Sequence, residues 1–128
     1  MKPVKLCVGF LLVKDNLFLA EKRSLNKRTF PGVLSIPGGC VEAGESPEDA
    51  LFREVKEELS VDVKDFHFLD VKQDFMNNKT YELHYFVVDD WVGEICANEA
   101  DEVFWLSFDD WEQIVPEVDR EILKENFL

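Results

Sequence analysis

The alternation of apolar and polar residues divides the chain into short strands, an internal helix and a helical C-terminal part. Residues 4–13 form a long apolar run that is typical of a central strand. Asp15 and Asn16 then predict a hairpin turn into the next strand. Segments 66–73 and 81–88 alternate and predict an antiparallel pair on either side of residues 76–79. Other strands are expected at residues 17–22, 34–36, 94–96 and 103–106.

The internal helix has clear start signals and one apolar face. Ser46 is a good N-cap, and Asp49 three residues later can complete a capping box. Apolar residues then recur every four positions, as Leu51, Val55 and Leu59. This helix can therefore pack one side on a sheet while its other side faces an open site.

The C-terminal part is expected to hold two helices, at residues 109–115 and 117–127, separated or kinked at Pro116. Strands that frame an internal helix and are followed by helices predict an α/β layered domain with a mixed sheet. The sequence has no internal repeat, linker or low-complexity stretch. Residues 1–128 are therefore expected to form a single domain.

Three carboxylates share the other face of the internal helix. Glu54, Glu57 and Glu58 stand at i, i+3 and i+4, and like charges at such spacing destabilise an isolated helix by about 0.2–0.5 kcal/mol. A divalent cation with oxygen ligands removes this cost, and Mg²⁺ is the usual choice where phosphates complete its coordination. Upstream, Gly38 and Gly39 let the backbone approach a ligand closely, so that a carbonyl here can bind a metal. A solvated acidic surface is the alternative.

The order of strand, glycine pair, capped helix and paired acids resembles the Nudix box, G-x5-E-x7-R-E-U-x-E-E-x-G-U, in which U is apolar. The positions that match are Gly39, Glu45, Arg53, Glu54, Val55, Glu57, Glu58 and Val61. Ser60 stands where the family has its second glycine. That glycine commonly follows the helix in the left-handed conformation, so Ser60 is expected to adopt φ > 0 at a cost of about 1 kcal/mol or to end the helix differently.

The resemblance implies a fold and a metal site. The fold would be a Nudix-type α/β/α sandwich with a mixed β-sheet, and the cofactor Mg²⁺ or Mn²⁺. The implied metal ligands are the carbonyl of Gly39 and the carboxylates of Glu54, Glu57 and Glu58. Arg53 is expected to orient a glutamate by hydrogen bonding, unless it only forms a surface pair with Glu57. A metal-bound water would attack phosphorus.

The resemblance also implies a glutamate outside the box. MutT-like members of the family place a catalytic or metal-binding glutamate in a loop before a strand that carries an aromatic residue. The spacing from Trp105 selects Glu99 here, with Glu102 in reserve. The proton of the attacking water would pass to Glu54 or to this loop glutamate. A solvated acidic loop is the alternative for residues 97–102.

Two residues are expected to bind the substrate. Arg23 follows the second strand, as do arginines that reach a substrate phosphate in the family, although it is one of several basic residues in segment 22–28. Asp119, soon after Pro116, is expected to contact the edge of a base.

Charge and composition limit the partners. The net charge of −13 and the lack of a basic stripe argue against a long nucleic acid, which leaves a small nucleotide bound through a metal and a few cations. No apolar run reaches the length of a membrane span, and residues 1–13 lack a cleavage site and are typical of a strand, so a cytoplasmic protein is expected. Cys7, Cys40 and Cys96 match no zinc pattern and are expected to be reduced thiols.

The implied reaction is metal-dependent hydrolysis of a diphosphate linkage in a nucleoside diphosphate derivative. The segment after the box lacks the proline of ADP-ribose enzymes and the tyrosine of diadenosine polyphosphate enzymes. The small size of the chain and the resemblance to MutT-like proteins in the Glu99–Trp105 region favour a (d)NTP pyrophosphohydrolase giving NMP and pyrophosphate. It would act as a monomer or homodimer. The alternatives are an ADP-ribose or nucleotide-sugar pyrophosphatase and a catalytically silent Nudix-like nucleotide-binding module. An acidic helix that only binds a protein partner would need neither the glycine pair nor Arg53 beside Glu54.

Overall fold

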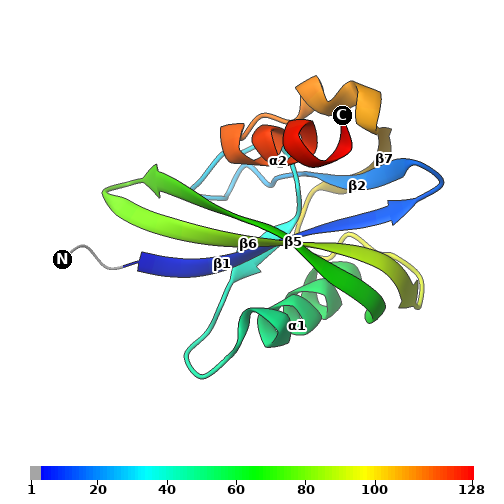
Figure 1. Ribbon diagram of the computed structural model, residues 1–128, viewed down its shortest axis with the longest axis horizontal. Coiled ribbons are helices and arrows are strands. Elements are labelled where there is room, and N and C mark those ends of the chain that lie inside the picture. The colour runs from blue at the N-terminus through cyan, green and yellow to red at the C-terminus, as the bar shows by residue number, and fades with distance from the viewer. Residues whose placement is uncertain (1–3) are drawn as a thin grey trace.

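The computed structural model describes residues 4–128, and its mixed sheet lies between helices on both faces (Figure 1). Helix α1 (Pro47–Leu59) covers one face, and α2 (Glu117–Phe127) with the 3₁₀ helix η1 (Phe108–Gln113) covers the other. Residues 1–3 of the expected N-terminal segment lie outside the described residues. The α/β/α sandwich expected from the sequence is confirmed.

The strands are β1 (Val4–Lys14), β2 (Leu17–Lys22), β3 (Leu34–Ser35), β4 (Gly38–Cys40), β5 (Asp62–Met76), β6 (Lys79–Val92) and β7 (Glu102–Ser107). Their order across the sheet is β3-β2-β1-β6-β5, with β4 paired to β1 and β7 paired to β2. Strands β1 and β6 run parallel, from Val4 opposite Thr80 to Leu12 opposite Val88. The other pairs are antiparallel, so the sheet is mixed as expected.

Two tight turns connect consecutive antiparallel strands. Asp15 and Asn16, between β1 and β2, have φ of 53° and 62°. Asn77 and Asn78, between β5 and β6, have φ of 52° and 63°. Positive φ at both central residues gives the turn type whose twist matches that of the flanking strands, and Asn and Asp tolerate this conformation best after glycine.

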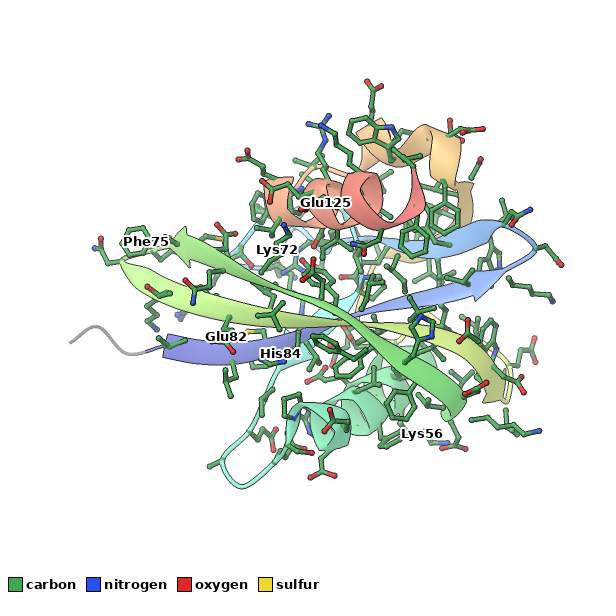
Figure 2. The ribbon with its side chains drawn as sticks, in the orientation of Figure 1. Lys56, Lys72, Phe75, Glu82, His84 and Glu125 are labelled. Carbon is green, nitrogen blue, oxygen red and sulfur yellow. The ribbon has the colours of Figure 1, made fainter. Side chains whose placement is uncertain are left out.

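The apolar run of β1 serves both faces of the sheet. Because side chains alternate along a strand, Val8, Phe10 and Leu12 pack with α1 while Leu11 packs with α2. The stripe of Leu51, Val55 and Leu59 on α1 is fully buried against the first group. On the opposite face Ile122 and Leu123 of α2 are fully buried in the second core. Figure 2 shows Lys72 of β5 and Glu125 of α2 pointing toward each other, and they form an ion pair at the edge of this core.

Three local expectations were wrong. Residues 94–96 are not a strand, because the Cys96 amide donates to the carbonyl of Leu59 and the segment lies along the end of α1. The glycine pair does not only end a strand: Gly38–Cys40 forms β4, and a Cβ at Gly38 would collide with the Val8 carbonyl of β1. The helix expected at residues 109–115 is the shorter 3₁₀ helix η1.

None of the helices within residues 4–128 is long and apolar enough to cross a membrane.

Candidate active site

Helix α1 begins as the sequence predicts and aims its acids at β4. The Ser46 hydroxyl accepts from the Asp49 amide at 3.1 Å, and the Asp49 carboxylate accepts from the Ser46 amide at 3.2 Å. This capping box fixes the first turn and with it the rotation of the helix. Glu54 and Glu58 then lie inward, 9% and 6% exposed, while the Glu57 side chain is half exposed.

Gly39 and Glu54 are in close contact. A Cβ at position 39 would displace the Glu54 carboxylate, so glycine lets this carboxylate pack directly on the backbone of β4. The structure thus brings together the carbonyl-bearing segment and the first acid of the expected metal site.

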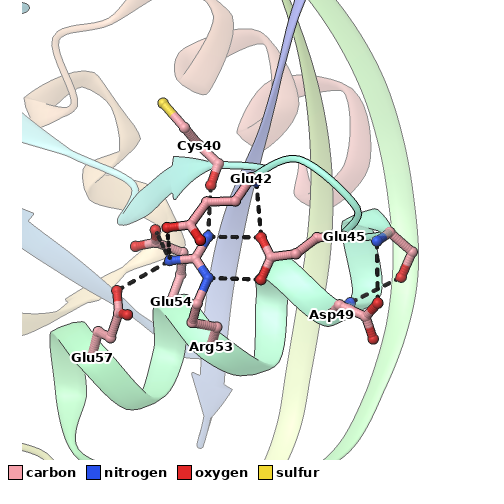
Figure 3. A network of polar contacts seen from close by, with 8 residues as sticks. Cys40, Glu42, Glu45, Asp49, Arg53, Glu54 and Glu57 are labelled. Atoms are coloured by element: carbon pink, nitrogen blue, oxygen red, sulfur yellow. Dashed lines mark hydrogen bonds and ion pairs between the residues drawn. The ribbon is translucent and has the colours of Figure 1, made fainter.

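The guanidinium of Arg53 organises the carboxylates around it (Figure 3). It binds Glu45 through two nitrogens, at 2.7 and 2.9 Å, and donates to Glu54 at 2.8 Å and to Glu57 at 3.1 Å. Its Nη2 also donates to the carbonyl of Cys40 at 2.8 Å. The hydrogen bonds from Arg53, helped by one from the Glu42 amide, lower the pKa of Glu45 to about 2. Arg53 is therefore more than a surface partner of Glu57: it joins β4, the loop before α1 and the acidic face of α1.

Glu58 is a buried acid without a partner. Its Oε2 has no hydrogen-bond partner among the described residues. Burial, and then the charges of Glu21, Glu54 and Glu99, raise the pKa of Glu58 to about 10 against the opposing effect of Lys27. A cation bound at this carboxylate would stabilise its charged form.

Glu21 is a site residue that the sequence interpretation missed. It lies on β2 and is 4% exposed, with Arg23 Nη1 at 3.4 Å from its carboxylate. Burial is the main cause that raises its pKa to about 7. The alternation of side chains along β2 could have predicted this burial, because Glu21 is on the same side of the strand as Leu19, which packs with α1.

These residues fit a divalent metal. Within residues 4–128 no three acidic, histidine or cysteine side chains converge on a metal position, since Arg53 draws Glu54 and Glu57 to itself. The unpartnered Oε2 of Glu58 nevertheless leaves one carboxylate oxygen available as a donor. Carboxylate and carbonyl oxygens are the donor set that suits Mg²⁺.

The loop that carries Glu99 is tied to the end of α1. Asn98 donates its backbone N–H to the Glu58 carbonyl and its side-chain amide to the Glu57 carbonyl, both at 3.0 Å. The same side-chain amide donates to the Ser60 hydroxyl at 2.7 Å. Glu99, with a side chain 44% exposed, lies 3.9 Å from Lys27. The charge of Glu99 also contributes to raising the pKa values of the buried acids Glu21, Glu54 and Glu58.

The reserve residue Glu102 begins β7, opposite Lys22 of β2, and is exposed.

Ser60 ends α1 in the left-handed conformation, with φ of 64° and ψ of 20°. Of the two outcomes expected for this departure from the box, the first is therefore confirmed. The Ser60 hydroxyl and Asn98 form a bond that glycine would lack.

A cavity of about 230 Å³ lies beside the acidic face and contains the expected substrate-binding residues. Arg23, Gly39 and Asp119 line it, together with Tyr81. Arg23 is held by Thr29, whose carbonyl and hydroxyl oxygens accept at 3.0 and 3.2 Å.

Asp119, at the inner end of this cavity, is buried. One oxygen accepts from the Tyr85 hydroxyl and the other from the Ile36 amide at 3.1 Å. Burial raises the pKa of Asp119 to about 6 against these two hydrogen bonds. Asp119 thus holds the wall of the cavity in place and retains lone pairs for a further donor.

The sequence model of the NUDIX domain matches residues 3–125. The chain belongs to the NUDIX family. The match covers both the box and the elements around it, so the resemblance seen in segment 39–61 extends over nearly the whole NUDIX chain.

Relatives of this NUDIX protein include MutT-like enzymes. It is 34% identical over 90 residues to an 8-oxo-dGTP diphosphatase of Haemophilus influenzae, covering 70% of this chain and 65% of that protein. It is 27% identical over 107 residues to an 8-oxo-dGTP diphosphatase of Escherichia coli, covering 84% of this chain and 82% of the relative. The crystal structure of a MutT NUDIX hydrolase from Burkholderia pseudomallei has the same fold, with a TM-score of 0.89 at 23% identity over 99% of this chain and 100% of the other.

Proposed function

We propose that this Nudix-family pyrophosphohydrolase hydrolyses nucleoside triphosphates, ribo or deoxy, to NMP and pyrophosphate with Mg²⁺ or Mn²⁺. The observation that carries the proposal is the buried, unpartnered carboxylate of Glu58. It lies on the same helix as Glu54, whose carboxylate packs on Gly39 in the lining of the cavity. An uncompensated buried acid is costly unless a cation binds it.

The metal would be held by the Gly39 carbonyl and by Glu54, Glu57 and Glu58. When bound, it would offset phosphate charge and lower the pKa of a bound water. Arg53 would hold the direction of Glu54 through its hydrogen bond at 2.8 Å, while Glu45 fixes the guanidinium from the other side.

The proton of the attacking water would be taken by a carboxylate of the chain. Glu54 is the first candidate, because burial raises its pKa above the ordinary value of a glutamate despite the nearby Arg53. Glu99 is the second, on a loop that Asn98 anchors to α1. Arg23 would bind a phosphate at the mouth of the cavity, and Asp119 would accept from the base.

The size of the cavity supports a triphosphate over a dinucleotide-like substrate. A volume of about 230 Å³ lies below the range of about 300–1,000 Å³ of sites for drug-sized ligands, and suits one nucleoside. ADP-ribose or a nucleotide sugar would need a second subsite for its distal sugar. The 8-oxo-dGTP diphosphatase relatives act on a purine deoxynucleoside triphosphate, so we include the oxidised purine in the proposed substrate class.

We expect small nucleotides to be the only ligands that this protein acts on, in the cytoplasm, as a monomer or homodimer. Long nucleic acids and membranes are not expected partners at a net charge of −13.

A release assay tests the proposal. The panel holds the four dNTPs, 8-oxo-dGTP, ADP-ribose and a nucleotide sugar, each with Mg²⁺ and with Mn²⁺. A higher kcat/KM for a triphosphate, with NMP and pyrophosphate as products, is expected. Glu58→Gln should lose the activity, whereas Glu48→Gln, an exposed acid in the first turn of the same helix, should keep it. Preference for ADP-ribose, or NDP and phosphate as products, would overturn the substrate assignment. If none of the compounds is hydrolysed, the function would instead be that of a nucleotide-binding module.

A further inference from the structure

Two of the three cysteines face each other across β1 and β4. Cys7 and Cys40 are register partners, and their sulfurs are 3.8 Å apart. The next pair along the ladder is hydrogen-bonded, since the Val41 amide donates to the Leu6 carbonyl at 2.9 Å. Hydrogen-bonded and non-hydrogen-bonded pairs alternate in an antiparallel ladder, so Cys7 and Cys40 occupy a non-hydrogen-bonded pair, in which side chains lie closest.

This geometry allows a disulfide with little movement. Cα atoms in a non-hydrogen-bonded pair are about 4.5 Å apart, within the range of about 4.4–6.8 Å that disulfides span. The sulfurs need to approach from 3.8 Å to about 2.05 Å. Both cysteines are free thiols in the structure.

The two thiols differ in access. Cys40 is exposed, whereas Cys7 is 9% exposed and lies on the inner side of the pair. Both line the proposed nucleoside cavity. An oxidant in solution therefore meets Cys40 first and finds Cys7 next to it. Cys96 is also exposed, but it lies on the segment beside the end of α1, where its sulfur contacts the Glu94 carbonyl at 3.7 Å.

We propose that Cys7 and Cys40 form a peroxide-sensitive dithiol that closes into a reversible disulfide and slows the neighbouring active site. The Cys40 thiolate attacks one oxygen of the peroxide, the O–O bond breaks, and hydroxide leaves and takes up a proton as water. The sulfur of Cys7 then attacks the sulfenic acid on Cys40, its proton leaves with the departing oxygen, and a second water forms. In total, two thiols pass two electrons to one peroxide and give one disulfide and two waters. A dithiol reductant reverses the bond by exchange.

The disulfide would act on the site through β4. The Cys40 carbonyl accepts from Arg53 Nη2 at 2.8 Å, and the preceding residue, Gly39, packs on the Glu54 carboxylate. Figure 3 shows the Cys40 sulfur on the side away from this carbonyl, so a pull on the sulfur turns the residue against the Arg53 network. Misplacement of catalytic groups by about 1 Å can cost about 10²-fold in rate, so we expect a loss of about tenfold or more in kcat/KM. This activity effect rests on the proposed function.

Mass spectrometry of the wild-type protein, before and after digestion, tests the proposal directly. Reduced protein is treated with hydrogen peroxide, quenched and digested without reductant. The expected result is the loss of two hydrogen atoms and a peptide pair joined through Cys7 and Cys40, both reversed by a dithiol. Stepwise gain of oxygen at Cys40 without cross-linking, or a disulfide that involves Cys96, would overturn the proposal.

Variants and activity complete the test. Cys96→Ser should form the same disulfide as wild type, and Cys7→Ser should instead carry a sulfenic acid that a dimedone probe traps. The wild-type mass result stands by itself if Cys7→Ser fails to fold. Full activity of completely cross-linked wild-type protein would overturn the coupling to the site. Should no substrate turn over, the mass result alone still decides whether the disulfide forms.

Discussion

Ser60→Gly should change stability by an amount that depends on Asn98. The serine holds φ of 64°, which costs a residue with a Cβ about 1–2 kcal/mol relative to glycine. Glycine also lowers the stability by about 0.5–1 kcal/mol, because it increases the conformational entropy of the unfolded chain. It also loses the hydroxyl that accepts from Asn98 at 2.7 Å, an exposed bond with a contribution of about 0.5–1 kcal/mol. The three contributions nearly cancel, so Ser60→Gly alone is expected to lie within about 0.5 kcal/mol of wild type.

A double-mutant cycle separates these contributions. In an Asn98→Ala background the hydroxyl has already lost its donor, so Ser60→Gly should now stabilise the protein by about 0.5–1 kcal/mol. The measurement is urea unfolding of the four proteins with equal m-values. Ser107→Gly is the matched control: the Ser107 hydroxyl also accepts a hydrogen bond, here from the Asp109 amide, but Ser107 has φ of −67°, so this change should only lose stability. Additivity of the cycle within about 0.3 kcal/mol would refute the Ser60–Asn98 bond. A loss of more than about 1 kcal/mol in Ser60→Gly alone would refute the left-handed strain.

Three further changes test the site. Arg53→Lys keeps the charge but cannot hold Glu45 through two nitrogens, so kcat should fall about tenfold or more, and a normal rate in a steady-state assay would contradict the positioning role. Glu57→Gln and Glu58→Gln should each lower kcat by about a hundredfold or more while the far-UV circular dichroism is kept, and wild-type rates in either would remove the metal-site interpretation. Asp119 has its pKa raised from 3.8 to about 6, so its contribution to stability is full below pH 4 and is lost as pH rises through 6. As pH rises from 4 to 7, the free energy of unfolding of Asp119→Asn should therefore increase relative to that of wild type by up to about 3 kcal/mol in denaturant titrations. A difference between the two proteins that stays constant with pH would contradict this assignment.

Local signals made the α1 region predictable from sequence. The capping box of Ser46 and Asp49 involves residues three apart, and the apolar stripe of α1 depends only on helical spacing. The two hairpin turns were predictable for the same reason, because Asp15–Asn16 and Asn77–Asn78 define the turn by their own conformations.

Contacts between distant segments were not predictable in this way. The 94–96 segment has a strand-like composition, but hydrogen bonds to the end of α1 decide its course. The burial of Glu21 depends on packing between distant segments, which the sequence of β2 indicates only through its alternation. The partners of Asp119 are 34 and 83 residues away along the chain, at Tyr85 and Ile36, so its structural role became visible only in the fold.

The position of β1 in the sheet has a consequence for synthesis of the protein. Its local hairpin with β2 pairs only Val13 with Phe18 and Lys14 with Leu17. The nine-residue parallel ladder that secures the rest of β1 needs β6, which ends at Val92. Loop closure over such a distance is slow, so the pairing of β1 with β6 forms late, although β4 can pair with Cys7–Gly9 of β1 earlier. During translation the edge of β1 that pairs with β6 therefore stays unpaired until residues 80–88 have left the ribosome, and chaperone binding at this edge would protect the nascent protein from aggregation.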